Sequence, residues 1–427
     1  MDRLPTINWL PTMWLPTMWW LYVILFIFIF YIILNAYIRI KMKFWYTQPV
    51  FHLYNLWYWV NPPGLLYSEP PPINKYTNIV NIKQYDINTI DKSLLDTVCH
   101  FIKNYYVQSP HTKYIPQQKN IVEYLKSSNQ ASYLTLYQTP KILFEKNEPT
   151  TMIDDIVSVI TARPLNITLK GQPPFPTYYV DNLCVHPQQR KGGIAPQMIE
   201  THYYYLRQNN PKINTCLFKR EGELNAIVPL TTYETFCFQI TNEMVLVPIL
   251  TTPTPYINVI EIGVAQLSLF LDFIHTQKNN FACIIMPDVS NLINILKTEN
   301  IFIYGILDDG VILAVYIFRK PNLFYGKDEA IECILTAHNQ YYNNQKKNIK
   351  QKKNIMKSIF LNGFNISLNK IKEKLKTTIL LLENTGHTNI IIDALPATSL
   401  LFKSPTAFFF YNYACYSVPS NKCLILY

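Results

Sequence analysis

Residues 181–196 read DNLCVHPQQRKGGIAP and have the pattern of a strand that passes through a loop into a helix. The mostly apolar run Tyr178–Val185 predicts the strand, and apolar residues at helical spacing over Ile194–Leu206 predict the helix. Arg190 and Lys191 stand just before the two glycines that open this helix. Since unpaired amides and the positive dipole end make a helix N-terminus attractive to anions, the loop predicts a phosphate-binding site.

The six residues Arg190–Ala195 fit the pattern R/Q-x-x-G-x-G/A of GNAT-type acyltransferases. Glycines let a backbone approach a pyrophosphate closely, and coenzyme A carries such a group. The pattern is weakly specific on its own, because a Gly-Gly turn that opens a helix is usually only a turn. The segments around the loop therefore decide between these two interpretations.

Several of these segments resemble the N-myristoyltransferases, the glycylpeptide N-tetradecanoyltransferase family. Asn182–His186 (NLCVH), followed by Ala195 and Pro196, is similar to the family's F-L-C-V-H and V-A-P residues. Upstream, Phe44–Val50 (FWYTQPV) resembles its F-W-x-T-Q-P-V segment. Two separated similarities in the right order are more specific than either one alone.

Further matches extend the resemblance from about residue 43 to the end of the chain. Asn104–Val107 is similar to the family's N-Y-V helix end, and Ile160–Ile167 (ITARPLNI) to its I-S-A-x-P-x-N-I stretch. Asp393–Leu395 and Cys423–Tyr427 agree in placement with its final segments. The resemblance implies an α+β fold of tandem GNAT-like halves that form a saddle-shaped mixed sheet with surrounding helices.

The resemblance also implies which residues bind an acyl-CoA co-substrate, myristoyl-CoA or another acyl-CoA, with no permanently bound cofactor. These residues are Phe44 and Trp45 packed on the coenzyme, Leu183, Cys184 and Val185 along the thioester, and Arg190, Lys191, Gly192, Gly193, Ile194 and Ala195 around the phosphates. An amphipathic juxtamembrane segment would explain Phe44 and Trp45 equally well, because tryptophan favours the membrane interface.

Family members perform catalysis largely with main-chain groups. By resemblance, the backbone amides of Asn182 and Leu183 form an oxyanion hole, which needs no particular side chain. The terminal carboxylate of Tyr427 would accept a proton from an N-terminal glycine amine, and burial can raise its pKa towards the useful range. Without the resemblance, a hydrophobic C-terminal segment would more simply indicate an edge strand.

The N-terminal region predicts a membrane anchor. Trp19–Ile38 holds no charged residue and is about long enough to cross a bilayer of roughly 30 Å as a helix. Arg39, Lys41 and Lys43 follow it while only Arg3 precedes it, which predicts a single-pass protein with its catalytic body in the cytosol. A cleaved signal peptide is the alternative, although no small-x-small cleavage site lies before the basic cluster.

Patterning along the chain predicts three regions: a repeat and anchor over 1–43, an acyl-CoA-binding half over 44–250 and a peptide-binding half over 251–427. The prolines of the tandem repeat WLPTMWLPTM at 9–18 predict no regular structure. The other expected elements are helices at Leu94–Tyr105, Ala265–Ile274 and Ile366–Glu383, a hairpin over Ile301–Phe318 that turns at 308–310, a strand at Ile390–Asp393, and a linker at Pro248–Pro255.

Composition narrows the classes of partner. The 427 residues are 49% hydrophobic and carry a net charge of +10, which suits anionic partners such as nucleotide phosphates or membrane lipid. The 8 cysteines form no CxxC pair, so no metal site is expected. The lysine-rich tract at 346–353 is more typical of a solvated loop than of a nucleic-acid site, and no nucleic-acid partner is expected.

Departures from the family cluster where a peptide would bind. The acidic loop after N-Y-V becomes Gln108–Gln118, which holds no Asp or Glu. Cys216–Gly222 and Leu230–Phe236 replace two further family motifs, and the F-R-F-x-Y-S run is missing. The leading hypothesis is an enzyme that transfers a long-chain acyl group to N-terminal glycine peptides or proteins. The alternatives are an inactive membrane scaffold of the same fold, and a GNAT acetyltransferase that uses a short acyl-CoA.

Overall fold

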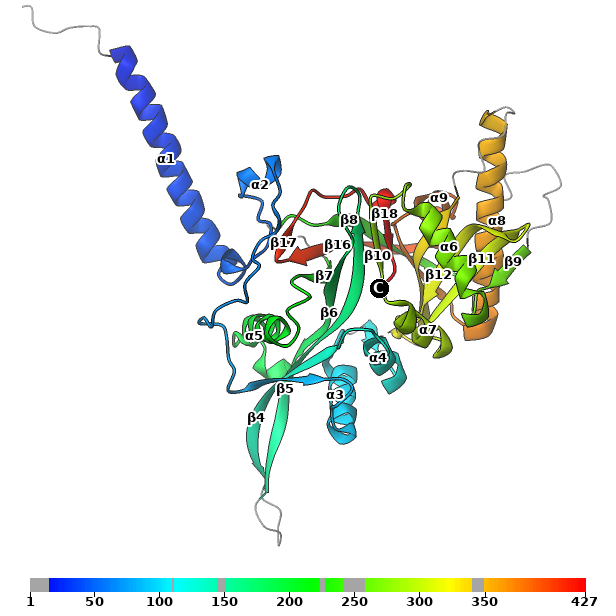
Figure 1. The fold of residues 1–427 in the computed structure, drawn as a ribbon, viewed down its shortest axis with the longest axis horizontal. Helices are drawn as coiled ribbons and strands as arrows, with labels where there is room; N and C mark the ends of the chain where they lie inside the picture. The colour runs from blue at the N-terminus through cyan, green and yellow to red at the C-terminus, as the bar shows by residue number, and fades with distance from the viewer. Residues whose placement is uncertain (1–14, 110, 144–150, 223–226, 241–257, 340–348) are drawn as a thin grey trace, which may run out of the picture. The chain divides into compact units, whose positions relative to one another are not determined.

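A computed structural model describes residues 15–109, 111–143, 151–222, 227–240, 258–339 and 349–427. The chain forms two compact units, Met1–Gln48 and Pro49–Tyr427 (Figure 1). The expected linker at 248–255 lies outside the described residues.

The first unit consists of the long helix α1 (Leu15–Met42) and the short 3-10 helix η1 (Trp45–Thr47). The side chains of Trp19–Met42 are almost all exposed and strongly apolar, and their length and composition suit a membrane span and equally a signal sequence. The expectation that the prolines preclude regular structure is wrong for Leu15–Met18, which begin α1. Pro16 is tolerated there because first-turn amides have no acceptor within the helix.

In the part of the second unit that the structure describes, a large mixed sheet of 16 strands carries helices on both faces (Figure 1). Twelve strands follow the order β18-β10-β5-β6-β7-β16-β8-β15-β14-β12-β11-β9, and β2, β3, β4 and β13 pair off this path. The strands are β2 (Ile82–Asp86), β3 (Thr112–Tyr114), β4 (Tyr133–Leu143), β5 (Thr151–Leu169), β6 (Phe175–Val185), β7 (Cys216–Glu221), β8 (Thr231–Gln239), β9 (Asn258–Glu261), β10 (Cys283–Met286), β11 (Ile301–Asp308), β12 (Val311–Arg319), β13 (Leu323–Tyr325), β14 (Asp328–His338), β15 (Ile379–Glu383), β16 (Leu400–Tyr411) and β18 (Cys423–Ile425).

A small second sheet and the helices complete the unit. A separate two-stranded sheet pairs β1 (Gly64–Leu65) with β17 (Tyr413–Ala414). The helices are α2 (Leu56–Val60), α3 (Lys92–Tyr105), α4 (Gln118–Leu125), α5 (Ile194–Asn209), α6 (Leu267–Gln277), α7 (Val289–Lys297), α8 (Ile349–Leu375) and α9 (Asn389–Ile392), with 3-10 turns η2 (Pro187–Gln189), η3 (Val264–Gln266), η5 (Ala397–Ser399) and η6 (Ser420–Lys422).

Successive strand residues point to opposite faces of the sheet, and this alternation separates the cores. On β5, Val159 packs with the apolar residues of α3 and α4, while its neighbour Ile160 packs with Met198 of α5. On β12, Ile317 faces the core of α6 and α7, while Phe318 faces Phe364 of α8. Each half of the sheet is therefore covered by helices on both faces.

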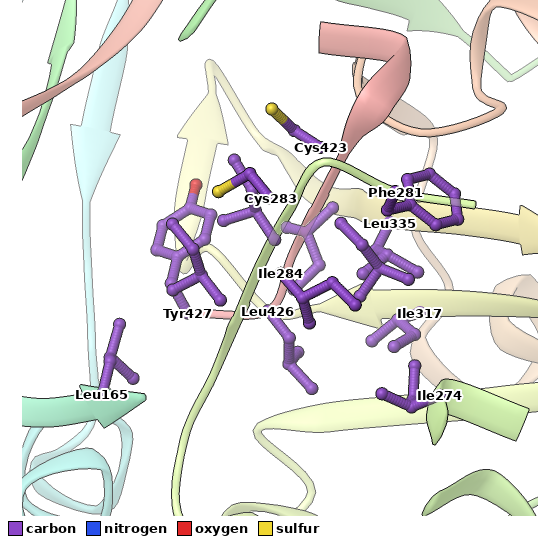
Figure 2. Close-up of a cluster of buried hydrophobic side chains, with 14 of the residues drawn as sticks. Leu165, Ile274, Phe281, Cys283, Ile284, Ile317, Leu335, Cys423, Leu426 and Tyr427 are labelled. Atoms are coloured by element: carbon purple, nitrogen blue, oxygen red, sulfur yellow. The ribbon is translucent and has the colours of Figure 1, made fainter. Parts of the chain in front are cut away.

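Strands from distant parts of the sequence alternate in the sheet. β10 lies beside β5, and β16 is inserted between β7 and β8. β18 pairs in parallel with β10, so that Ile285 opposes Ile425. Figure 2 shows Cys423, Leu426 and Tyr427 among buried side chains from β5, β10, β12 and β14. The end of the chain is thus part of the central core.

Several predicted elements are confirmed, namely α3, α5, α6, the strand β6 and the hairpin of β11 and β12. Two predictions near the C-terminus are wrong. The expected helix to Glu383 ends at Leu375, and residues 379–383 form the buried strand β15. The expected strand at 390–393 is instead the helical turn α9, whose Ile391 is fully buried.

Candidate functional site

The loop between β6 and α5 is held in place by its own arginine. The Arg190 side chain donates from Nε to the Val185 carbonyl at 3.1 Å and from Nη2 to the Tyr105 carbonyl at 3.2 Å. It thereby joins the end of β6 to the end of α3. Gly193 caps α5 with a left-handed φ of +77° and no side chain, so the first amides of the helix are not covered by a capping group.

A β-bulge interrupts β6 just before this loop. In the register with β5, Cys184 opposes Val159 and Asp181 opposes Thr161, so Asn182 and Leu183 together face a single residue. Asn182 has a left-handed φ of +53°, and its N–H donates to its neighbour Asp181 Oδ1 at 2.7 Å. Bulges commonly re-aim backbone groups next to active sites, and this one lies where the sequence predicts an oxyanion hole.

The bulge, the loop and the helix start surround a pocket of about 610 Å³. The pocket is lined by Tyr105, Tyr106, Val107, Leu183, Cys184, Val185, Gln189, Arg190, Lys191, Gly193, Ile194, Ala195 and Pro196. Its size is in the range of small-molecule sites, and an α-helix N-terminus opens onto it. We call this hollow the loop pocket.

A second pocket of about 370 Å³ shares Tyr106 and Val107 with the loop pocket. It is lined by residues of β5, β6, β7 and β14, and both Asn182 and Tyr427 are among them. The Tyr106 hydroxyl donates to Asp181 Oδ1 at 3.1 Å, and burial followed by the nearby Asp181 charge raises the Tyr106 pKa well above its usual value. We call this second hollow the polar pocket.

The Tyr427 side chain is 2% exposed and its hydroxyl joins a buried ionic network at the polar pocket. The hydroxyl accepts from Lys219 Nζ at 2.8 Å and from Arg319 Nη2 at 2.9 Å, and donates to Glu383 Oε1 at 2.5 Å. Arg319 also binds Glu332 through Nε and Nη2. Because every member has a charged or hydrogen-bonding partner, the network can remain buried.

The two carboxyls of this network differ in their pKa. Burial raises the pKa of Glu383, and the charge of the adjacent Lys219 only partly offsets this increase. Burial would also raise the pKa of Glu332, but the charges of Arg319 and Lys219 together outweigh burial, so the Glu332 pKa is lowered. The surroundings therefore shift the pKa values of the two carboxyls in opposite directions.

The sequence-predicted site residues fall into three groups. Leu183, Cys184 and Val185 and the loop residues Arg190, Lys191, Gly193, Ile194 and Ala195 line the loop pocket, while Gly192 belongs to the same loop without lining it. Asn182 and Tyr427 line the neighbouring polar pocket. Phe44 and Trp45 belong to the first unit, where their rings lie edge to face with centroids 5.2 Å apart, and their contact with a coenzyme stays a prediction.

Sequence reasoning missed four charged residues of the polar pocket, Arg163, Lys219, Arg319 and Glu332, together with Glu383, which accepts from Lys219 and from the Tyr427 hydroxyl. They come from five different strands, so no local spacing connects them. The only available signal was the position of Arg163 and Glu383 within or next to apolar strand sequences, ITARPLNI and ILLLE.

No family model matches the chain, and no curated protein matches its sequence. Its fold is similar to crystal structures of Saccharomyces cerevisiae N-myristoyltransferase with bound myristoyl-CoA. One matches with a TM-score of 0.64 at 16% identity over 88% of this chain and 94% of that chain. Two others match with TM-scores of 0.63 and 0.61 at 14% and 16% identity, over 88% of this chain and 89% and 91% of theirs. At this identity the similarity shows a shared fold.

Proposed function

We propose that this protein is a membrane-anchored acyltransferase that moves a long-chain acyl group from acyl-CoA to the N-terminal glycine amine of a peptide. The observation that supports it most is the loop pocket, where a bulged strand, a cationic loop and an uncovered helix N-terminus meet in a fold similar to a myristoyl-CoA-binding enzyme. The coenzyme phosphates would lie against α5, and the thioester along Leu183–Val185.

The reaction needs a neutral amine and a stabilised oxyanion. The Tyr427 carboxylate would take one proton from the glycine ammonium, and the amine nitrogen would then attack the thioester carbonyl. Backbone amides at Asn182 and Leu183 would bind the oxyanion, and the Asn182 N–H would have to turn from Asp181 towards it. As the C–S bond breaks, the second amine proton would go to the departing thiolate.

The direct test uses the full-length chain in detergent micelles with myristoyl-CoA and a library of glycine-initiated peptides. Binding is measured by calorimetry and transfer by mass spectrometry. We expect myristoyl-CoA to bind and one class of peptide to gain the acyl group. Binding without transfer to any peptide would favour the inactive scaffold, and transfer from acetyl-CoA alone would favour a short-chain GNAT enzyme.

The role of the terminal carboxylate needs its own variant, because the Tyr427 hydroxyl is bonded as well. Extending the chain by one glycine moves the carboxylate and keeps the tyrosine side chain. We expect this extension to abolish transfer while myristoyl-CoA still binds in the loop pocket. Tyr427→Phe keeps the carboxylate in place and serves as the matched control, with reduced stability and retained transfer. Full activity of the extended chain would exclude the carboxylate as the base.

A further inference from the structure

Arg163 is a buried cation that lines the polar pocket. It lies on β5 opposite Tyr179 of β6, and its side chain lines the pocket although the residue is only 5% exposed. The guanidinium carbon is 5.1 Å from the ring centroid of Tyr124 and 5.3 Å from that of Tyr179. Contact with two aromatic rings fixes the guanidinium group and leaves its N–H edges to bind a ligand.

The described residues give Arg163 no hydrogen-bond partner at its buried Nη1, and the buried Tyr124 hydroxyl likewise lacks one. No carboxylate of the described residues forms an ion pair with Arg163. Burial, more than any neighbouring group, lowers the Arg163 pKa, as expected for a cation removed from water. An unpartnered buried donor costs free energy that a ligand with an acceptor group can recover.

The carboxylates around the pocket already have partners of their own. Glu332 is paired with Arg319, and Asp181 accepts from the Tyr106 hydroxyl and the Asn182 amide. Glu221 lies 3.3 Å from Lys219. These carboxylates are already bound to other residues of the protein. The anion that complements Arg163 therefore belongs to a ligand.

We propose that the polar pocket binds a carboxylate side chain of the acyl acceptor through Arg163 and the Tyr124 hydroxyl. This inference rests on the proposed function, since it assigns the pocket that Asn182 and Tyr427 share to the acceptor. The neighbouring loop Gln108–Gln118 contains no acidic residue that would repel such a peptide. The preferred acceptor is therefore a glycine-initiated peptide with Asp or Glu within its first few residues.

The experiment measures peptide affinity by fluorescence anisotropy with the full-length chain in micelles. Glycine-initiated peptides carry Glu, Gln or Lys at each of positions 2 to 6, and each is measured with and without a thioether analogue of myristoyl-CoA that cannot transfer its acyl group. We expect a Glu peptide to bind at least tenfold more tightly than its Gln counterpart, which is about 1.4 kcal/mol. Arg163→Met should remove this preference and Arg163→Lys should restore part of it.

Lys278→Met removes an exposed cation and is the matched control for net charge, which should leave the preference unchanged. Equal affinity for Glu and Gln peptides in the wild type would overturn the inference. So would an Arg163→Met variant that keeps the preference for Glu peptides. If the analogue fails to bind while Glu peptides still bind through Arg163, the proposed function falls and the anion site stands.

Discussion

Gly193 is the residue on which the loop pocket most depends. Its φ of +77° is a conformation that β-branched residues rarely adopt, and it places the first amides of α5 at the pocket. Gly193→Val should therefore raise the dissociation constant for myristoyl-CoA at least tenfold, because either the backbone moves or the valine side chain blocks the phosphates. Isothermal titration calorimetry measures this change.

Gly171→Val is the matched control for Gly193→Val. Gly171 also has a left-handed φ, of +82°, and open space where a side chain would be, but it lies at the other end of β6. Both variants should lose a similar amount of stability, while only Gly193→Val should lose affinity. Unchanged affinity in Gly193→Val would mean that the loop is an ordinary turn.

The lowered pKa of the buried His202 predicts how the stability of the protein changes with pH. Burial lowers its pKa to about 3, and burial likewise lowers that of His387 to about 3. An unfolded histidine titrates near ~6.5, so between these values the unfolded chain binds more protons than the folded one. The free energy of unfolding should then fall as the pH drops below 6.5, by about 2 kcal/mol per histidine at pH 5. Thermal unfolding at pH 7.5 and pH 5 measures the loss.

The variant His202→Gln separates this effect from general acid sensitivity. This variant should unfold at a lower temperature than the wild type at both pH values. The difference between its unfolding temperatures at pH 7.5 and pH 5 should be smaller, since one titrating group is gone. His275→Gln changes an exposed histidine and should keep the wild-type difference. A pH dependence that His202→Gln leaves intact would exclude His202 as its source.

From spacing alone, residues of the candidate site were predictable only where they lie close together in the sequence. The loop residues Arg190–Ala195 follow one another in sequence, so a six-residue pattern together with the family-like segments around it indicated the loop that lines the loop pocket. Lys219, Glu332 and Glu383 meet because β7, β14 and β15 belong to one sheet, and their separation in sequence carries no trace of that contact. A charge inside an apolar strand is the general signal for such groups.

At the scale of elements, helix α8 approaches the sheet closely at one glycine. A methyl group added at Gly363 would lie 2.4 Å from Ile306 Cδ1 and 2.7 Å from the Tyr316 hydroxyl, which is itself bonded to the Phe360 carbonyl. Gly363→Ala should destabilise the protein by about 1–3 kcal/mol, because overpacking outweighs the gain of about 1 kcal/mol in helix propensity. Chemical denaturation measures the difference.

Asn369→Ala is the control, because it makes a comparable gain in helix propensity at an exposed position of the same helix. This variant should be as stable as the wild type or slightly more stable. A stabilised Gly363→Ala would show that α8 can shift away from β11 and β12 at little cost. The close packing of this helix would then be incidental to the fold.

Elements were predictable where amphipathic periodicity was strong and long, as in α3 and α5. The prediction of a helix up to Glu383 was wrong because residues 379–382 are all apolar. A short apolar run of this kind fits a buried strand and a buried helix equally well. Lys376, with a left-handed φ of +53°, ends α8, and the β-branched Thr377, Thr378 and Ile379 that follow favour the strand. The run at 390–393 was ambiguous for the same reason.

At the scale of the whole molecule, the exposed apolar helix α1 suits a membrane span and equally a signal sequence, and fractionation distinguishes the two. If α1 is a span with its basic end in the cytosol, alkaline carbonate should leave the full-length chain in the membrane pellet. Protease added to sealed microsomes should then digest the body from Pro49 onward. Immunoblotting with antibodies to the body and to a lumenal marker measures both results.

Removal of residues 1–42 is the control, and the truncated chain should appear in the soluble fraction. A protected body would reverse the topology and place the proposed site away from cytosolic acyl-CoA. A chain that is shortened by the length of α1 and released from the membrane would identify this helix as a signal sequence.

The insertion of β16 between β7 and β8 has a consequence for how the protein is made. β8 ends at Gln239 and β16 begins at Leu400, and a ribosome adding ~5–20 residues per second needs roughly 10 to 30 s to cover that distance. Throughout that interval the nascent chain carries strands whose final neighbour has not been synthesised, and unpaired strand edges readily join other chains. Production of this protein should therefore depend on chaperone supply more than its finished stability suggests.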